Sequence, residues 1–405
     1  MNINMYKQRG AVSLFVVVFA ALLITIVTVS FVRIMVQNQQ QASTTDLSQS
    51  AYDSAQAGVE DAKRALLRYQ SICSGDITKC DDSKINSLEC NIALDQVEGV
   101  TLSGGEVKVQ TDKANALDQA YTCVKINLDT IDYLGTLSAN ESRIVPLTGV
   151  GSFDTVQIQW FSSKDISSDK NYEVNLQKLS EGVPLLAQNS WAINRPSILR
   201  TQLIQIGGFG FILTDFDKIV DVGGGVTQSN ANTLFLYPTG TTGSVSSTIS
   251  EETFKGHDTR LLATGVPLPI ACSGNLEAGG YACTVKLTLP TPIGAGERIS
   301  FLRLSALYNK TNYRVTLLDS TKICDQTTGI GAGCVKFDAV QPEIDSTGRA
   351  NDLFRRVQTR VELIDVNFPY PEATVVETDG NFCKDFRVTD SVDDYLNSCP
   401  IINEP

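Results

Sequence analysis

An uninterrupted apolar run near the amino terminus limits what this chain can fold into. Twenty-two consecutive residues, Ala11–Val32, include no charged residue, no glycine and no proline. A helix rises about 1.5 Å per residue, so this run covers roughly 33 Å and is long enough to cross a bilayer. A cleaved secretory signal has a shorter apolar region, whereas this run continues past Arg33 to Val36. The sequence therefore predicts a transmembrane segment over residues 11–36 and disfavours an ordinary signal peptide.

The charges that flank this segment predict its orientation. Lys7 and Arg9 precede it, so the positive-inside rule makes residues 1–10 a cytoplasmic leader and places the remaining chain outside the cell. Beyond Arg33 the chain holds 30 basic and 45 acidic residues. An acidic body without a basic run gives no evidence for nucleic-acid binding, because affinity for phosphate backbones depends on lysine and arginine.

The helix is expected to continue beyond the membrane as a stem. Between Val36 and Tyr69 there is no proline, and Gly58 is the one glycine. Small and apolar residues recur at helical spacing, and they would share one stripe: Leu47, Ala51, Ala55, Val59, Ala62, Leu66 and Tyr69. Residues 37–70 are therefore predicted to be an amphipathic stem helix that docks a globular head. A plain signal anchor followed by a coiled segment fits the same stripe.

The cysteines indicate the compartment of the body. All ten follow the apolar run: Cys73, Cys80, Cys90, Cys123, Cys272, Cys283, Cys324, Cys334, Cys383 and Cys399. An even number is typical of disulfide bonding in an oxidising space, and the connectivity cannot be deduced from sequence. Zinc binding is the competing interpretation, but there is no C-x-x-C and His257 is the only histidine. We therefore expect an extracellular, disulfide-bonded body.

The remaining sequence predicts a mostly antiparallel β body, and hence an α+β chain. Alternating segments rich in valine, isoleucine, threonine and aromatic residues are separated by glycine-containing turns. The predicted strands are 106–110, 122–128, 155–160, 197–206, 233–237, 281–289, 298–307, 312–318 and 356–364. The cysteine distribution suggests a small subdomain over residues 71–150 and a β-rich extracellular domain over residues 151–405.

Catalytic and cofactor motifs are missing from the sequence. His257 lies between turn-like residues without a nucleophile elbow, and no phosphate-binding loop motif occurs. Two acidic groups, 215–221 and 390–394, could supply oxygen ligands to calcium, but neither matches a calcium loop and solvated loops explain them better. We expect no enzyme activity, no cofactor and no metal site.

The leader and the residues after it carry a family resemblance. Gln8-Arg9-Gly10 followed by Ala11 and the apolar run resembles the cleavage region of type IV prepilins, in which a prepilin peptidase cuts after the glycine. The segment 55–62, AQAGVEDA, looks like the A-x-A-G-x-E-x-A element of minor pilins of the PilX type. Residues 347–363 look like the late strand region in which a last strand closes the pilin sheet.

One departure from the family pattern narrows the expected class. Most pilins have glutamate at the fifth mature position, whereas this chain has Phe15. In this respect it resembles tip-located minor pilins and the K-type pseudopilins of type II secretion systems, which also lack that glutamate. The resemblance implies other pilin subunits and membrane lipid as partners of a helix that includes Phe15 and Val17.

The sequence therefore predicts a non-enzymatic minor or tip subunit of a surface filament. The alternative is an unprocessed, single-pass surface adhesin or receptor that keeps its leader. An anchored hydrolase is a third and weaker hypothesis, since the single histidine argues against it. The ligand of the surface domain cannot be named from the sequence.

Overall fold

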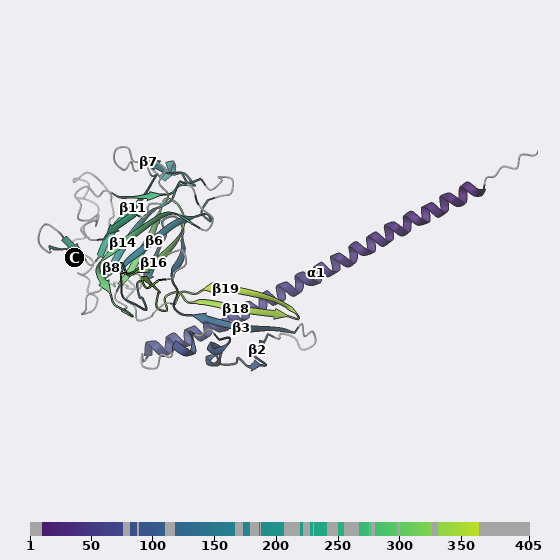
Figure 1. Cartoon of the computed structure of the whole chain (residues 1–405), viewed down its shortest axis with the longest axis horizontal. Coiled ribbons are helices and arrows are strands. Elements are labelled where there is room, and N and C mark those ends of the chain that lie inside the picture. The colour runs from purple at the N-terminus through teal and green to yellow at the C-terminus, as the bar shows by residue number, and fades with distance from the viewer. Residues whose placement is uncertain are drawn as a thin grey trace, which may run out of the picture. The chain divides into compact units, whose positions relative to one another are not determined.

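The computed structural model of the chain describes residues 10–75, 82–86, 89–109, 118–166, 173–178, 186, 188–205, 219–221, 227–229, 231–240, 250–254, 267–274, 276, 280–297, 300–325 and 331–363. Figure 1 shows the helix α1 and the strands of the two main sheets. The leader, His257, the acidic group at 390–394 and most of the one at 215–221 lie outside the described residues.

One helix, α1, runs from Gly10–Gly75 and is 66 residues long. The predicted continuity of membrane segment and stem is confirmed, and the helix extends five residues past the predicted end at residue 70. No proline or glycine occurs between Tyr69 and Ser74, so the backbone stays helical until it reaches Gly75. Among the described residues this is the one helix long and apolar enough to cross a membrane.

The smaller sheet packs against the second half of α1. Its order is β1-β2-β3-β18-β19, and every neighbouring pair is antiparallel. The strands are β1 (Leu102–Ser103), β2 (Glu106–Lys108), β3 (Gln119–Asn127), β18 (Glu343–Ala350) and β19 (Leu353–Arg360). β18 therefore pairs with β3 from more than 200 residues earlier, β19 pairs with β18, and both late strands lie alongside α1 (Figure 1).

The larger sheet has twelve strands, all from the chain between β3 and β18. Its main path is β17-β16-β6-β14-β13-β11-β8-β15-β5, while β12 pairs with β14, β4 with β16 and β7 with β11. The first six are β4 (Tyr133–Leu137), β5 (Ser142–Pro146), β6 (Phe153–Ser162), β7 (Gln177–Lys178), β8 (Ile198–Gln205) and β11 (Ala231–Gly240). The others are β12 (Ser250–Thr253), β13 (Leu268–Cys272), β14 (Tyr281–Ile293), β15 (Ser300–Leu307), β16 (Thr311–Leu318) and β17 (Cys334–Val335).

The short elements complete the description. They are a pair of strands, β9 (Ile219–Asp221) and β10 (Thr227–Ser229), and the 3-10 helices η2 (Asp82–Lys84), η3 (Ile92–Gln96) and η5 (Gln188–Ser190). Every strand predicted from the sequence overlaps an observed strand. Three of the pairings in the larger sheet, those of β11 with β13, β11 with β7 and β12 with β14, are parallel. The predicted α+β fold with a mostly antiparallel β body is confirmed.

Each sheet has its own apolar core. Trp160 lies fully buried among the inward side chains of the larger sheet, and its indole Nε1 donates to the Ser197 carbonyl at 3.1 Å. Between α1 and the smaller sheet, Ala62 and Leu66 pack with Tyr121, Val124 and other residues from β3. Along β18 every second residue is buried and the residues between them are partly buried, which explains why α1 covers one face of the smaller sheet.

Asp132 links the two sheets through charge. Its Oδ2 lies 2.7 Å from Nε of Arg314 on β16, and its Oδ1 lies 2.7 Å from Nη1 of Arg360 on β19. The Asp132 side chain is 8% exposed, so both ion pairs are largely shielded from water. A carboxylate shared in this way connects the strand that closes the smaller sheet to the larger one.

The described cysteines form disulfides. The pairs are Cys90–Cys123, Cys272–Cys283 and Cys324–Cys334, and Cys73 is disulfide-bonded as well. Cys80, Cys383 and Cys399 lie outside the described residues. The predicted disulfide bonding is thus confirmed for these pairs. Cys272 and Cys283 also lie opposite each other on β13 and β14. The pairing of these two strands consists of that one residue pair, so the disulfide strengthens it.

The smaller sheet combines strands from two separate parts of the chain, and the larger sheet lies between them in sequence. Residues 102–127 and 343–360 share the smaller sheet, whereas residues 133–335 form the larger one. Sheet membership does not by itself define a folding unit, so the predicted division at residue 150 stays a prediction. The larger sheet is an insertion between two adjacent strands of the smaller one.

Candidate assembly helix and its contact with the sheet

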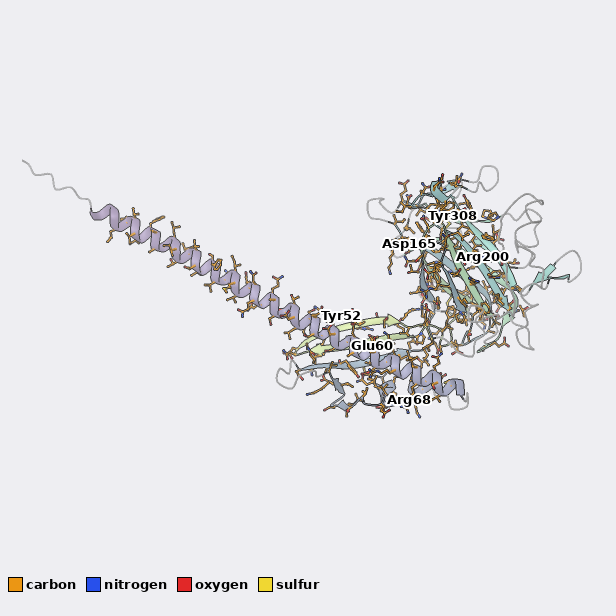
Figure 2. All side chains as sticks on the ribbon, turned by 180° about the vertical axis from the view of Figure 1, so that it is seen from behind. Tyr52, Glu60, Arg68, Asp165, Arg200 and Tyr308 are labelled. Atoms are coloured by element: carbon orange, nitrogen blue, oxygen red, sulfur yellow. A yellow bond between two sulfur atoms is a disulfide. The ribbon has the colours of Figure 1, made fainter. Side chains whose placement is uncertain are left out.

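The first half of α1 exposes its apolar side chains. From Leu14 to Asp46 every residue is exposed, and Phe15 and Val17 expose 77% and 63% of their surface. The side chains project on all sides of this half of the helix (Figure 2). Such a large apolar surface is unstable in water, so it has to be covered by lipid or by other apolar helices.

The second half of α1 buries one stripe against the smaller sheet. Ala51, Ala55, Ala62 and Leu66 are fully buried, and Val59 is 5% exposed. Leu47 and Tyr69, at the two ends of the predicted stripe, are partly buried. Figure 2 marks this half with Tyr52, Glu60 and Arg68, all of which are exposed. The buried residues of the stripe therefore hold the sheet on the helix. A role of the stripe in filament assembly stays a prediction.

Two glycines let the helix and the sheet approach closely. A Cβ added to Gly348 on β18 would overlap the carbonyl oxygen of Ala51 and the amide nitrogen of Ala55. A Cβ on Gly58 would lie 2.5 Å from Oγ of Ser346 and 2.9 Å from Cγ2 of Val124. Because real Cβ contacts are longer, the observed spacing requires glycine at both positions.

Hydrogen bonds between α1 and the smaller sheet supplement this apolar interface. Tyr121 on β3 is buried, and its hydroxyl donates to Oδ2 of Asp61 on α1 at 2.6 Å. Burial, together with this hydrogen bond, raises the pKa of Tyr121 well above its usual range. Near the start of the covered half, Nε of Arg355 donates to Oγ of Ser48 at 2.7 Å. These bonds fix the register of the helix on the sheet.

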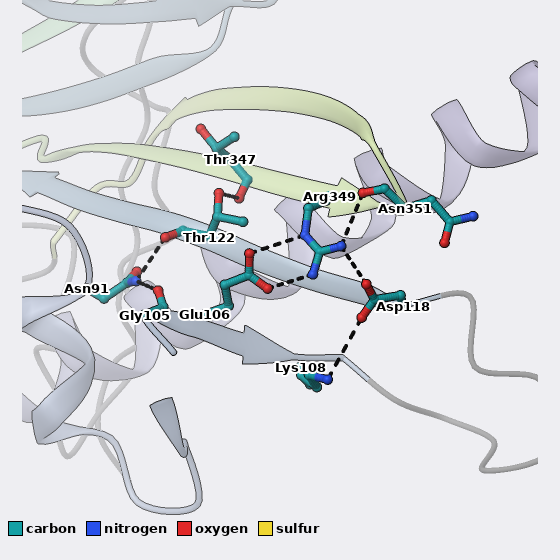
Figure 3. A network of polar contacts seen from close by, with 9 residues as sticks. All are labelled: Asn91, Gly105, Glu106, Lys108, Asp118, Thr122, Thr347, Arg349 and Asn351. Carbon is teal, nitrogen blue, oxygen red and sulfur yellow. Dashed lines mark hydrogen bonds and ion pairs between the residues drawn. The ribbon is translucent and has the colours of Figure 1, made fainter. Parts of the chain in front are cut away.

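An arginine next to Gly348 holds three strands of the smaller sheet together (Figure 3). Arg349 on β18 donates to both oxygens of Glu106 on β2, at 3.2 and 2.6 Å, and to Oδ2 of Asp118 at 2.8 Å. The hydrogen bond from Arg349 and its charge lower the pKa of Asp118. Lys108 approaches the other oxygen of Asp118 at 3.8 Å. One guanidinium therefore ties β18 to β2 and to the residue that precedes β3.

Asn91 joins the segment before η3 to the same sheet (Figure 3). Its Nδ2 donates to the carbonyls of Gly105 and Thr122 at 2.9 and 3.0 Å, and its Oδ1 accepts from the amide of Val124 at 2.8 Å. Asn91 is buried and has a positive φ of 68°. The neighbouring disulfide Cys90–Cys123 places this residue against β3.

The predicted cleavage site and the metal hypothesis remain to be compared with the structure. Gly10 and Ala11 are the first two residues of α1, and cleavage between them stays a prediction. The metal hypothesis has no support in the part of the chain that the structure describes, where no group of three histidine, cysteine or acidic side chains could hold an ion.

The residues that hold the smaller sheet together and against α1 were not identified from the sequence. The contact of Gly348 with α1 and the ion pairs of Arg349 involve partners far away in the chain. A signal was present for Gly348, because a glycine within a strand often marks the close approach of another backbone. No local pattern could have paired Arg349 with Glu106.

Comparison with known proteins gives no direct assignment. No protein-family model, curated protein or solved structure matches this chain. Its architecture, a long apolar helix packed on a disulfide-bonded antiparallel β body, is consistent with that of pilins. The helix and the disulfides together suggest a membrane-anchored or secreted protein.

Proposed function

We propose that this chain is a non-enzymatic minor or tip subunit of a type IV pilus or a pilin-like surface filament. The observation that carries the proposal is the division of α1 into two halves. One continuous helix exposes an apolar half and buries a small-residue stripe against a five-stranded sheet. An anchor alone needs no such stem, whereas a filament subunit needs a helix that is first held in lipid and then packed among other helices.

The leader supports cleavage before assembly. Gly10 and Ala11 follow a basic leader, in the arrangement that resembles a prepilin cleavage region. The proposal makes prepilin peptidase a partner, with residues 1–10 on the cytoplasmic side and the disulfide-bonded body on the outside. After cleavage the helix stays in lipid until it packs with other pilin subunits.

Two features favour a minor or tip position over the bulk of the filament. Phe15 occupies the place where most pilins have glutamate. The twelve-stranded sheet inserted between β3 and β18 adds a large body to the sheet that rests on the stem. A subunit at the tip has fewer neighbours to accommodate than one within the shaft, so an added body is tolerated best there.

The mass of the mature chain tests the proposal. The chain is expressed with a prepilin peptidase, purified from membranes and analysed by mass spectrometry. A product that begins at Ala11 is expected, and Gly10→Val should leave the leader attached. A product with an intact leader, or one that begins elsewhere, would reject the pilin assignment and would favour the unprocessed surface adhesin.

A further inference from the structure

A cleft in the larger sheet is lined mostly by polar side chains. Its volume is about 450 Å³, which lies within the range of small-molecule binding sites. The residues that line it come from β4, from the turn that follows β6, and from the starts of β14 and β16. None of these described residues belongs to α1 or to the smaller sheet, so the cleft is separate from the contact that holds the stem.

A buried carboxylate behind the cleft holds two of its segments together. Asp165, labelled in Figure 2, is 6% exposed and accepts from the amide and the hydroxyl of Ser162 at 2.8 and 3.2 Å. It also accepts from the amide of Asn312 at 3.0 Å and from its Nδ2 at 2.7 Å. These four donors occupy the carboxylate, so Asp165 positions Ser162 and Asn312 instead of binding a ligand itself.

The side-chain amide of Asn312 presents a donor and an acceptor in a fixed orientation. Its Nδ2 donates to Asp165, and its Oδ1 accepts from Oγ1 of Thr136 on β4 at 2.8 Å. An amide nitrogen has two hydrogens and an amide oxygen has two lone pairs, so one of each remains for a ligand. Neighbouring hydroxyl groups on a sugar ring offer the same combination of donor and acceptor. The amide is therefore suited to a pair of adjacent hydroxyls.

Two tyrosines and a leucine add carbon surface to the cleft. The ring of Tyr313 occupies the space that a side chain at Gly135 would need, because an added Cβ there would overlap the ring. Tyr281 is partly buried, and its hydroxyl forms no hydrogen bond within the described part of the chain. Leu134 is 38% exposed. Such a surface packs against the carbon-bound hydrogens of a ring, while a tyrosine hydroxyl can still bind its polar edge.

We propose that this cleft binds a pyranose sugar, with adjacent ring hydroxyls on the Asn312 amide and the carbon face of the ring near Tyr281. A wholly apolar ligand would leave the remaining donor and acceptor of Asn312 unpaired, which is costly. An open-chain polyol could pair with them, but it would lose far more conformational freedom on binding than a rigid ring. The proposal concerns the body alone and goes beyond the role of α1 in assembly.

Saturation-transfer NMR with simple sugars tests the proposal. The full chain is purified in a detergent without a sugar head group and is mixed with methyl β-glucoside, methyl β-galactoside or sorbitol. We expect saturation transfer to at least one of the two pyranosides. The affinity for sorbitol should be at least about tenfold lower, because sorbitol has similar hydroxyls on a flexible chain.

Variants of the chain locate the binding in this cleft. Asn312→Ala should weaken pyranoside binding about tenfold, and three of the four donors to Asp165 remain to keep the fold. Thr136→Val keeps the size of an exposed side chain and should weaken binding about threefold, because it frees the amide to turn. Thr288→Val is the matched control, since Thr288 is an exposed strand residue that does not line this cleft.

The outcomes that would overturn the proposal are distinct. They are the absence of transfer to both pyranosides, equal binding of sorbitol, and unchanged binding in Asn312→Ala. Binding of methyl glucuronide alone, with its loss in Lys164→Gln, would also overturn it and would show an anion site at the exposed Lys164. Cleavage of the leader at another residue would reject the filament subunit and leave these results unchanged.

Discussion

Gly348 of β18 lies directly against the backbone of α1 at Ala55, with no space between them for a side chain. The register between β18 and β3 shifts next to this glycine, because Thr347 pairs with Cys123 and Gly348 pairs with Tyr121. The extra residue is Thr122 on β3, so the bulge in β3 lies opposite the position where β18 has no side chain. Strand and stem are therefore held at backbone-to-backbone distance.

A side chain at this contact should separate the helix from the sheet. Gly348→Ala is expected to lower the free energy of unfolding of the smaller sheet by about 1–3 kcal/mol, and Gly348→Val by more, because the added atoms overlap the helix backbone. Hydrogen exchange of the β18 and β19 amides in the full chain measures this loss. Gly274→Ala is the matched control, since a Cβ there meets no atom within 4 Å. Unchanged exchange in Gly348→Val would contradict the observed spacing.

The disulfides should stabilise their own sheets separately. Cys90–Cys123 closes a separation of 33 residues, so its replacement by a pair of alanines should cost the smaller sheet roughly 3–4 kcal/mol. Alanines at Cys272 and Cys283 should act on the larger sheet instead. Hydrogen exchange resolved by strand distinguishes the two effects. Equal loosening of both sheets by either variant would show that they unfold as one unit.

Asp319 should contribute a pH-dependent part of the stability. A hydrogen bond from Lys322, followed by one from Thr321, lowers the pKa of Asp319 from 3.8 to about 2. Because the folded state holds the charged form, the stabilisation is present above pH 3.8 and is lost as the pH falls toward 2. The difference in urea midpoint between the unaltered chain and Asp319→Asn should shrink across this interval.

Lys322→Met provides the control for that titration. It removes the first cause of the shift, so the pKa of Asp319 should move back toward its ordinary value and the pH-dependent interval should move with it. A midpoint difference that stays constant from neutral to acidic pH would rule out this role of Asp319.

A charge in the exposed apolar half should prevent insertion. Val17→Lys places an ammonium group in the hydrocarbon region at a cost of up to about 3 kcal/mol, and we expect less chain in the membrane fraction and none in filaments. Gln39→Lys adds the same charge in the exposed polar stretch of the helix and should have little effect. Normal filament incorporation of Val17→Lys would contradict the assembly role of this half.

The sequence was a good guide to structure that depends on neighbouring residues. The uncharged run and the spacing from Leu47 to Tyr69 predicted a continuous helix and its buried stripe, because both follow from periodicity along one element. The strands of the larger sheet were found in the same way, since alternation of burial is a local property.

Pairings between distant segments could not be predicted from local patterns. The strand predicted at residues 356–364 was recognised, but its position beside the stem depends on the pairing of Glu343 with Asn127 across the inserted sheet. The partners of Arg349, and the space that Gly348 leaves for Ala55, follow from that pairing. Charge and size at these residues have meaning only once the topology is known.

The insertion between β3 and β18 determines the order in which the molecule can be completed. β18 is synthesised after every strand of the larger sheet, whereas α1 is the first element of the chain to be made. Ala51 and Ala55 therefore have no β18 to pack against until nearly the whole chain has been synthesised. A truncated or misfolded body would leave Ala51 and Ala55 exposed to solvent. The exposure of this stripe therefore depends on whether the larger sheet, which lies far along the chain, has folded.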